Sequence, residues 1–425
     1  MNAPTGHTLQ AVRAAPGMRS WAAWLLASLF FFFAFATRVS PSVMVDALMR
    51  DFALSAAIIG NLSAIYFYVY AALQIPIGVM LDKLGPRRLL SSGALVSALG
   101  CALFAVADSV TLAYFARLLI GGGVASSWIG ALAVIAQNFP RRRFAILAGG
   151  TQAFGMLGAT MGLGPLSLVV DSHGWRTGMW SLAVIGVALA VLLGFIVRDR
   201  ALSQGGPVGI GRAIQIAARN PQTWLCALFG MAMVGPMVAF AGLWAVPYLM
   251  QVHGMERTGA AALASTMFLA WAVGSPVLGG ISDHLRRRKP IMLLGGFSAT
   301  LLLAALPFLE RAPIVVLAML IMGVGLTSSA YVVGVTLARE SNPDEIGGTV
   351  NGLVNTCVIA SGAILQPLIG HVLDRHWTGL IAEGARIYPP QAFLWGLMVL
   401  PAACAIGILA ALCTRDAPEH AGAIK

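Results

Sequence analysis

Directly after a long apolar segment, the chain reads Gly78-Val-Met-Leu-Asp82-Lys83-Leu-Gly85-Pro-Arg87-Arg88. A second apolar segment is followed by Gly279-Gly-Ile-Ser-Asp283-His-Leu-Arg286-Arg287-Arg288-Lys289. Glycine, aspartate and a basic pair recur at one offset, since 283 − 82 = 201. A repeat at nearly half the length of the 425-residue chain indicates two homologous halves.

The composition places both loops in a membrane protein. Hydrophobic residues make up 58% of the chain and charged residues only 10%, against about 25% charged residues in a soluble domain. The chain therefore lacks the polar residues that would cover a soluble protein of this size. This balance argues against a soluble enzyme, a nucleic-acid binder and a disulfide scaffold.

Several segments are long and apolar enough to span a bilayer as helices, which needs about 20 residues each. Short connectors rich in turn and charged residues separate them, a pattern typical of a helical bundle rather than a barrel. The twelve predicted spans are 21–48, 56–81, 89–107, 111–136, 144–169, 177–197, 222–249, 260–282, 291–309, 314–338, 349–373 and 392–414.

The formal net charge of +11 is interpreted as a topology signal. Nineteen Lys and Arg residues fall on the side that holds both termini, and six fall on the other side. The positive-inside rule places the richer side in the cytoplasm, where it contacts anionic lipid rather than nucleic acid. We expect a multi-pass protein of a bacterial inner membrane. The expected parts are a cytoplasmic tail 1–20, a half 21–197, a cytoplasmic linker 198–220, a half 221–414 and a cytoplasmic tail 415–425.

Cysteine and histidine show no pattern that holds a metal. The five cysteines lie in apolar stretches without a CxxC pair, and the seven histidines form no HxxxH or HxH pair. We therefore predict no metal site and no disulfide framework. No nucleophile set or phosphate-binding loop is present either, so we expect no enzyme and no cofactor.

The repeated loop resembles the most specific signature of the major facilitator superfamily of secondary transporters, and the resemblance covers essentially the whole chain. It implies an all-α membrane protein of 12 transmembrane helices in two pseudo-symmetric six-helix halves. In that family the loop aspartate pairs with the basic residues and a helix terminus, which holds the outward-facing state. The gating residues so implied are Asp82, Arg87, Arg88, Asp283, Arg288 and Lys289. The alternative is a charge cluster that only fixes topology.

The second loop is expected to turn differently, because Arg286 stands where the first has Gly85. A further motif, Arg117-Leu-Leu-Ile-Gly121-Gly-Gly123, resembles the family's Arg-xxx-Gly-x-Gly in span four. That resemblance implies a role in proton coupling or helix contact for Arg117. An antiporter motif of span five is only half present, so antiport is not inferred from it.

Arg38 lies within span one, seventeen residues beyond Trp21 and so about 25 Å along a helix. An arginine at this depth costs at least about 2.5–3.5 kcal/mol on insertion scales, so it needs a cavity or a partner. Its guanidinium is suited to bind a carboxylate or phosphate through two parallel hydrogen bonds. The alternative is a structural ion pair with Asp46, eight residues on and near the same helix face. Asp46 is also a candidate proton site, or else an acid of the outer headgroup region.

The position of Arg38 resembles the organophosphate:phosphate antiporter branch, and also vesicular and lysosomal anion carriers. That branch adds a lysine in span two and a basic residue in span seven. This chain has Gln74 at the first position and no basic residue between Gln222 and Met250. One cation neutralises a dianionic phosphate poorly in a low-dielectric site. A monocarboxylate or a zwitterion, such as an amino acid or a dipeptide, therefore fits better.

The resemblance implies that spans one, four, seven and ten line a central cavity, with contributions from spans two, five, eight and eleven. Tyr66, Tyr70 and Gln74 recur every four residues, and such a polar stripe should face a cavity rather than lipid. Hydrogen bonding between helices is the alternative role for each polar residue. The predicted substrate-binding residues are Arg38, Tyr66, Tyr70, Gln74, Trp128, Gln152, Trp244, Tyr331 and Asn355.

The expected function is secondary active transport of a small organic anion or zwitterion by alternating access, with proton symport preferred. The alternatives are an anion exchanger for a phosphorylated metabolite and a transporter-like protein that only senses its ligand. The expected partners are the substrate, protons and the lipid bilayer, with no nucleic acid. The protein is expected to be a monomer.

Overall fold

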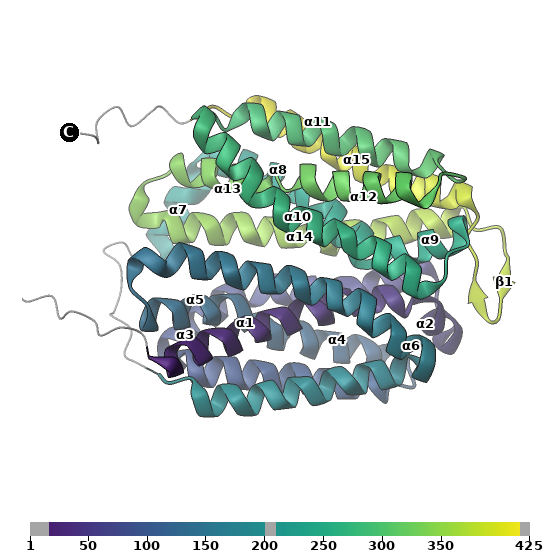
Figure 1. Cartoon of the computed structure of the whole chain (residues 1–425), viewed down its shortest axis with the longest axis horizontal. Coiled ribbons are helices and arrows are strands. Elements are labelled where there is room, and N and C mark those ends of the chain that lie inside the picture. Colours follow the sequence, from purple (N-terminus) through teal and green to yellow (C-terminus); the bar gives the residue numbers. More distant parts are fainter. Residues whose placement is uncertain (1–16, 200–209, 417–425) are drawn as a thin grey trace, which may run out of the picture.

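The computed structural model describes residues 17–199 and 210–416. Figure 1 shows two layers of helices that follow the order of the chain, the first half in purple to teal and the second in green to yellow. Residues 1–16, 200–209 and 417–425 lie outside the described residues, and they include most of both expected tails and the middle of the expected linker.

The first half is helical almost throughout. Its first helix gives way to a short 3-10 turn around Pro41, which has no N–H to continue the α-helical hydrogen bonds. Its elements are α1 (Met18–Val39), η1 (Ser40–Val43), α2 (Val45–Phe52), α3 (Ala56–Ala105), α4 (Val110–Val124), α5 (Ser126–Asn138), η2 (Arg141–Arg143) and α6 (Phe144–Ile196).

The second half repeats this architecture and adds a short hairpin. Helix α7 belongs to the linker, and a stretch of π-helix interrupts the seventh span after Pro236. The elements are α7 (Ile210–Arg219), α8 (Pro221–Pro236), η3 (Met237–Trp244), α9 (Ala245–His253), α10 (Arg257–Leu285), α11 (Lys289–Ala305), η4 (Leu306–Phe308), α12 (Ile314–Ser328), α13 (Tyr331–Glu340), η5 (Asp344–Ile346), α14 (Gly347–Arg375), β1 (Ile381–Ala382), β2 (Ala385–Arg386) and α15 (Pro390–Cys413).

Twelve crossings follow from these helices. The described residues contain 11 helical segments long and apolar enough to cross a membrane, and one of them, Ile146–Ile196, has 51 residues. A helix of that length would extend about 75 Å, more than twice the hydrocarbon core. Gly174 breaks it, because its φ of 83° and ψ of 164° are not helical. Division at Gly174 gives 11 + 1 = 12 crossings, which confirms the predicted fold class.

The two ends of the bundle differ. One end, here called the linker end, carries α7 and the residues Arg87, Asp199, Arg288 and Asp416. The other, here called the hairpin end, carries α2, α9 and the β1–β2 hairpin, in which Ile381 pairs antiparallel with Arg386. Figure 1 shows the linker end on the left and the hairpin end on the right.

Close backbone contact joins the halves where α3 packs along α14 and α10 packs along α6. Gly60 of α3 lies against the backbone of Gln366 and Pro367 in α14, and a Cβ built on it would stand 2.6 Å from the Gln366 carbonyl oxygen. A Cβ built on Gly370 of α14 would likewise clash with the backbone carbonyl oxygen of Ala56, and it would lie even closer. Only glycine allows helices from the two halves to approach this closely.

Candidate functional site

Arg38 lies in a cage of aromatic rings formed by α1 and α3. Its guanidinium carbon is 4.1 Å from the centre of the Phe35 ring and 5.5, 5.7 and 5.6 Å from the centres of the Tyr66, Phe67 and Tyr70 rings. Ring faces attract a cation, and a guanidinium stacks on them through its flat surface. The cage therefore holds the charge in place without neutralising it.

Among the side chains that the structure describes, no carboxylate pairs with Arg38, and its buried Nε has no hydrogen-bond partner. Asp46 instead accepts from Arg257 Nη2 at 2.5 Å. The expectation that Asp46 lies two turns along the same helix as Arg38 is wrong, because α1 ends at Val39 and Asp46 belongs to α2. An unpaired guanidinium in an apolar span leaves its donors free for an anionic ligand.

Arg117 of α4 is a different kind of arginine. It is only 1% exposed, and its Nη1 donates to the carbonyl oxygen of Thr37 at 2.9 Å, with a longer contact of 3.5 Å from Nη2 to Ser63 O. Its guanidinium carbon also lies 5.1 Å from the centre of the Tyr66 ring. Arg117 thus connects α4 with α1 and α3, which agrees with the expected helix contact and leaves proton coupling a prediction.

In the polar stripe of α3, Tyr66 and Tyr70 are buried beside Arg38, and the side chains of Tyr66 and Gln74 are already hydrogen-bonded. The Tyr66 hydroxyl donates to Ala34 O at 2.9 Å, and the Gln74 amide donates to Tyr70 O at 3.2 Å and Ala125 O at 3.4 Å. Tyr70 stacks on Tyr66 with ring centres 6.1 Å apart. These contacts fix the rings around Arg38, so Tyr66 and Gln74 act at least as positioning residues.

The other predicted wall residues divide into two groups. Trp244 is 1% exposed and its indole N–H donates to Gln366 O at 3.1 Å, so its polar atom is already hydrogen-bonded. Trp128, Gln152, Tyr331 and Asn355 are half-buried. Gln152 and Asn355 form no hydrogen bond within the described part of the chain, which leaves their amides available to a ligand.

Sequence reasoning missed Trp271 of α10. It is buried, its indole N–H has no partner among the described residues, and it stacks on Tyr331 with ring centres 6.1 Å apart. The sequence repeat could have identified it. Trp271 lies 271 − 70 = 201 residues after Tyr70, which is the offset between the two gating loops, so Trp271 is the repeat equivalent of Tyr70. Phe35 and Phe67 were missed because an aromatic residue in an apolar span carries no pattern of its own.

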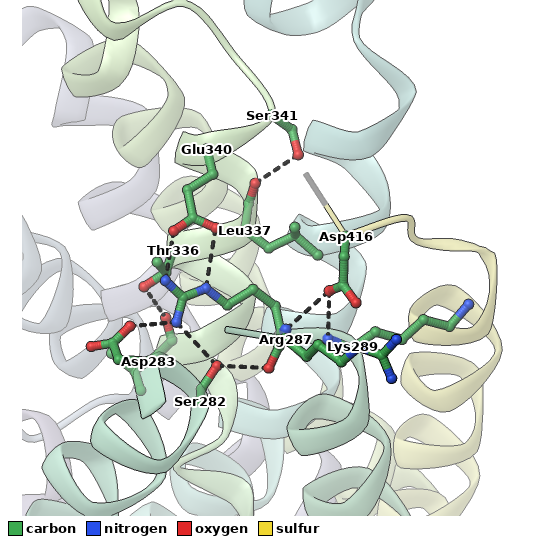
Figure 2. Close-up of polar contacts among 11 residues, drawn as sticks. Ser282, Asp283, Arg287, Lys289, Thr336, Leu337, Glu340, Ser341 and Asp416 are labelled. Atoms are coloured by element: carbon green, nitrogen blue, oxygen red, sulfur yellow. Dashed lines mark hydrogen bonds and ion pairs between the residues drawn. The ribbon is translucent and has the colours of Figure 1, made fainter. Parts of the chain in front are cut away.

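The second gating loop forms the expected ion cluster at the linker end. Arg288 donates to Asp283, to Glu340 Oε1 at 2.6 Å and to Ser282 Oγ at 3.1 Å. The hydrogen bond to Glu340 is the main reason why the pKa of Arg288 lies above its usual range. Figure 2 shows Ser282, Asp283 and Glu340 converging on this cluster from two helices.

The first loop shows less of the predicted pairing. The side chain of Asp82 lies outside the described part of the structure, and Arg87 Nε donates to Gly194 O at 2.6 Å. Arg88 is exposed. Lys289 also binds carbonyl oxygens rather than Asp283, with Nζ 2.6 Å from Leu412 O. The gating roles of these residues remain predictions.

The two turns differ as expected. Gly85 has φ 76° and ψ 166°, a region open essentially to glycine, whereas Arg286 has φ 51° and ψ 27°. In each turn an aspartate from beyond the last helix of the same half caps the next helix. Asp199 accepts from Arg87 N at 2.8 Å, and Asp416 accepts from Arg288 N and Lys289 N, both at 2.9 Å. Neither aspartate was predicted.

Asp416→Ala should lower stability by about 0.5–2 kcal/mol, the usual value of a lost helix cap. Asp199→Ala should cost less, because Asp199 caps one N–H and Asp416 caps two. Thermal unfolding of the purified variants in detergent measures both. Asp108→Ala is the control, since Asp108 is exposed and its side chain forms no hydrogen bond or ion pair with the described residues. Equal melting temperatures for Asp416→Ala and Asp108→Ala would contradict this assignment.

Twelve crossing helices, a two-fold repeat and an unpaired arginine inside a span define a multi-pass integral membrane transporter. The family model described as Major Facilitator Superfamily matches residues 26–367, and the chain belongs to this superfamily. This confirms the expected family, and the relatives named below are transporters or a sensor rather than enzymes.

Known relatives cover nearly the whole chain. It is 22% identical to the probable sulfoacetate transporter SauU of Cupriavidus necator over 93% of this chain and 95% of that protein. It is 24% identical to the membrane sensor protein UhpC of Escherichia coli over 89% and 90% of the two chains. The fold is similar to a bacterial homologue of the human lysosomal transporter Spinster in an inward-facing and unoccupied conformation, with TM-score 0.77, 17% identity and coverage of 94% and 98%.

Proposed function

We propose that this protein is a secondary active transporter of a small organic anion or zwitterion, and that Arg38 binds the anionic group. The observation that carries the proposal is the unpaired guanidinium of Arg38, held by four aromatic rings within a membrane span. Two parallel hydrogen bonds from its free donors suit a carboxylate or a similar planar anion. Similarity to a probable sulfoacetate transporter supports an organic anion.

The charges of the spans favour a substrate with a single anionic group at this site. The Nη atoms of Arg117 donate to backbone carbonyls and those of Arg257 bind carboxylates, whereas no guanidinium donor of Arg38 has a partner among the described residues. Half-buried amides such as Gln152 and Asn355 are suited to the neutral or zwitterionic remainder of the substrate. A monocarboxylate, amino acid or dipeptide fits this arrangement, and a dianionic phosphate fits it poorly.

Contacts between the halves support alternating access with the hairpin end closed. Ser42 Oγ donates to Leu243 O at 3.0 Å, and Asp374 accepts from Ala56 N and Ala57 N at 3.1 and 2.9 Å. The positive-inside rule assigns the linker end, with both termini, to the cytoplasm of a bacterial inner membrane. In the proposed orientation the closed hairpin end faces the outer solution, and we propose that the protein works as a monomer.

Proton symport is the preferred coupling, and exchange remains the alternative. Similarity to a membrane sensor protein supports a second candidate, a transporter fold that senses its ligand without moving it. The two functions share the Arg38 site and differ in net flux.

Uptake by purified protein in liposomes tests the proposal. Accumulation of a radiolabelled monocarboxylate or amino acid, driven by an inward proton gradient, is the expected result. A collapsed gradient should abolish accumulation in a symporter, and loading the vesicles with unlabelled anion should restore exchange in an antiporter. Binding without any flux across a panel of carboxylates, amino acids and dipeptides would favour the sensor, and no binding at all would overturn the proposal.

A further inference from the structure

Three charged residues join the halves at the hairpin end. Arg257, at the first turn of α10, donates from Nη2 to Asp46 Oδ2 at 2.5 Å and from Nη1 to Asp171 Oδ1. Asp46 belongs to α2 and Asp171 to α6, so both carboxylates lie on the first half and the guanidinium on the second. The Arg257 side chain is 15% exposed. The three residues are here called the triad.

Other charged groups surround the triad but are engaged elsewhere. On α2 and α6, Asp51 binds Arg176 at 2.7 Å and Arg50 at 3.6 Å. On β2, which packs against α2, Arg386 lies 3.4 Å from Asp374. Glu256 immediately precedes α10, His173 lies on α6, and His253 on α9 interacts electrostatically with Glu310.

The ion pairs of the triad stabilise the protein only while the two halves are in contact at the hairpin end. Two carboxylates bound to one guanidinium are necessarily close, and the N-terminus of α10 adds a further positive partial charge. Rigid-body separation of the halves at this end carries Arg257 and α10 away together. Asp46 and Asp171 then stay behind on the same half, side by side and without their cation.

Two neighbouring carboxylates that share a site do not both ionise readily, and one proton between them relieves the repulsion. We propose that Asp46 and Asp171 form a proton-binding site, occupied when the halves part at the hairpin end and emptied when Arg257 returns. The proton enters from the outer solution, and as Arg257 reforms its ion pairs the carboxylate passes the proton to water between the halves, on the inner side of the triad. The proposal deepens the proposed proton-coupled transport and rests on it for its place in the cycle.

Proton binding by the open state makes the equilibrium between the open and closed hairpin end depend on pH. The open state binds a proton that the closed state does not, so acid favours opening of the hairpin end. For one such proton the ratio of open to closed molecules rises by up to about tenfold per pH unit as the pH falls. The fraction of molecules with an open hairpin end should therefore rise as the pH falls.

Spin labels on the two halves measure this opening. Thr177→Cys on α6 and Leu380→Cys next to β1 place exposed labels at the hairpin end, in a background with Cys413→Ser and Cys357→Ser. Pulsed electron–electron distance measurements at pH 8, 7, 6 and 5, without substrate, report the fraction of molecules in a longer-distance population. This fraction should rise as the pH falls, and a distribution that does not move would overturn the proposal.

Substitutions of the triad carboxylates test whether these residues cause the pH-dependent opening. Asp46→Asn with Asp171→Asn should remove the pH dependence while the labels still report a folded protein. Asp51→Asn is the matched control, because it removes an outer carboxylate whose partners all lie within the first half. Burial acts to raise the pKa of Asp51, but hydrogen bonds from Trp175 and Arg176 outweigh it and hold that pKa below its usual value. The control should keep the wild-type pH dependence, and a double variant that titrates like wild type would overturn the assignment.

The outcome is separable from that of the proposed function. If the hairpin end opens with acid through Asp46 and Asp171 but liposomes accumulate no substrate, transport fails and the proton site stands. If substrate accumulates with protons while the double variant retains its pH-dependent opening, transport stands and this proton site is wrong.

Discussion

Replacement of Arg38 by lysine is expected to weaken substrate binding almost as much as replacement by alanine. Lysine keeps the positive charge but loses the planar pair of donors that grips a carboxylate from two sides. A charge-assisted hydrogen bond contributes about 1.5–3 kcal/mol, so loss of one of two lowers affinity roughly ten- to hundredfold. The aromatic cage adds to this loss, because the Phe35 ring, 4.1 Å from the guanidinium carbon, fits a flat cation.

Isothermal titration of the purified variants with the substrate found in the uptake panel measures these affinities. Arg176→Lys is a matched control, because Arg176 also lies over an aromatic ring, 4.3 Å from the centre of Trp175, yet stands at the hairpin end away from the cage. It should bind substrate as the wild type does. Unchanged affinity in well-folded Arg38→Lys protein would refute the proposed anion site.

Gly60→Ala is expected to reduce transport strongly while leaving each half folded. The new Cβ would lie 2.6 Å from Gln366 O and 2.8 Å from Pro367 Cα, both backbone atoms of the other half. Overpacking of this kind costs about 1–3 kcal/mol, which lowers the population of the closed hairpin end roughly five- to hundredfold. The cost falls on the closed state alone, because the clash exists only when α3 and α14 touch.

Initial uptake rates in liposomes, together with the spin-label distances, test this expectation. Uptake should fall by about the same factor as the closed population, and the longer distance should dominate. Gly352→Ala is the control, because it lies on α14 with no atom within 4 Å of a built Cβ. It should transport normally and be slightly more stable, as alanine favours helix by roughly 1 kcal/mol. Wild-type distances in Gly60→Ala would contradict the proposed interface.

Part of the candidate site could be predicted from the sequence. Arg38 could be singled out because a charge within an apolar span is costly, and Tyr66 and Tyr70 because they share one helix face. The repeat offset of 201 residues also relates Trp271 to Tyr70. The contact partners of these residues could not be predicted, because they depend on which helices pack against each other.

The sequence by itself determined the membrane location, the twelve crossings and the two related halves. Lipid offers no hydrogen bonds to an open backbone, so long apolar runs must form helices, and short loops order them. Only the tertiary structure decided how charges pair. Asp46 binds Arg257, 211 residues away, rather than Arg38, eight residues away, because α1 ends at Val39 and packing brings α10 to α2. Packing likewise brings Asp199 and Asp416 to the turns of the repeated loops, because side chains pair with whatever group folding places within reach.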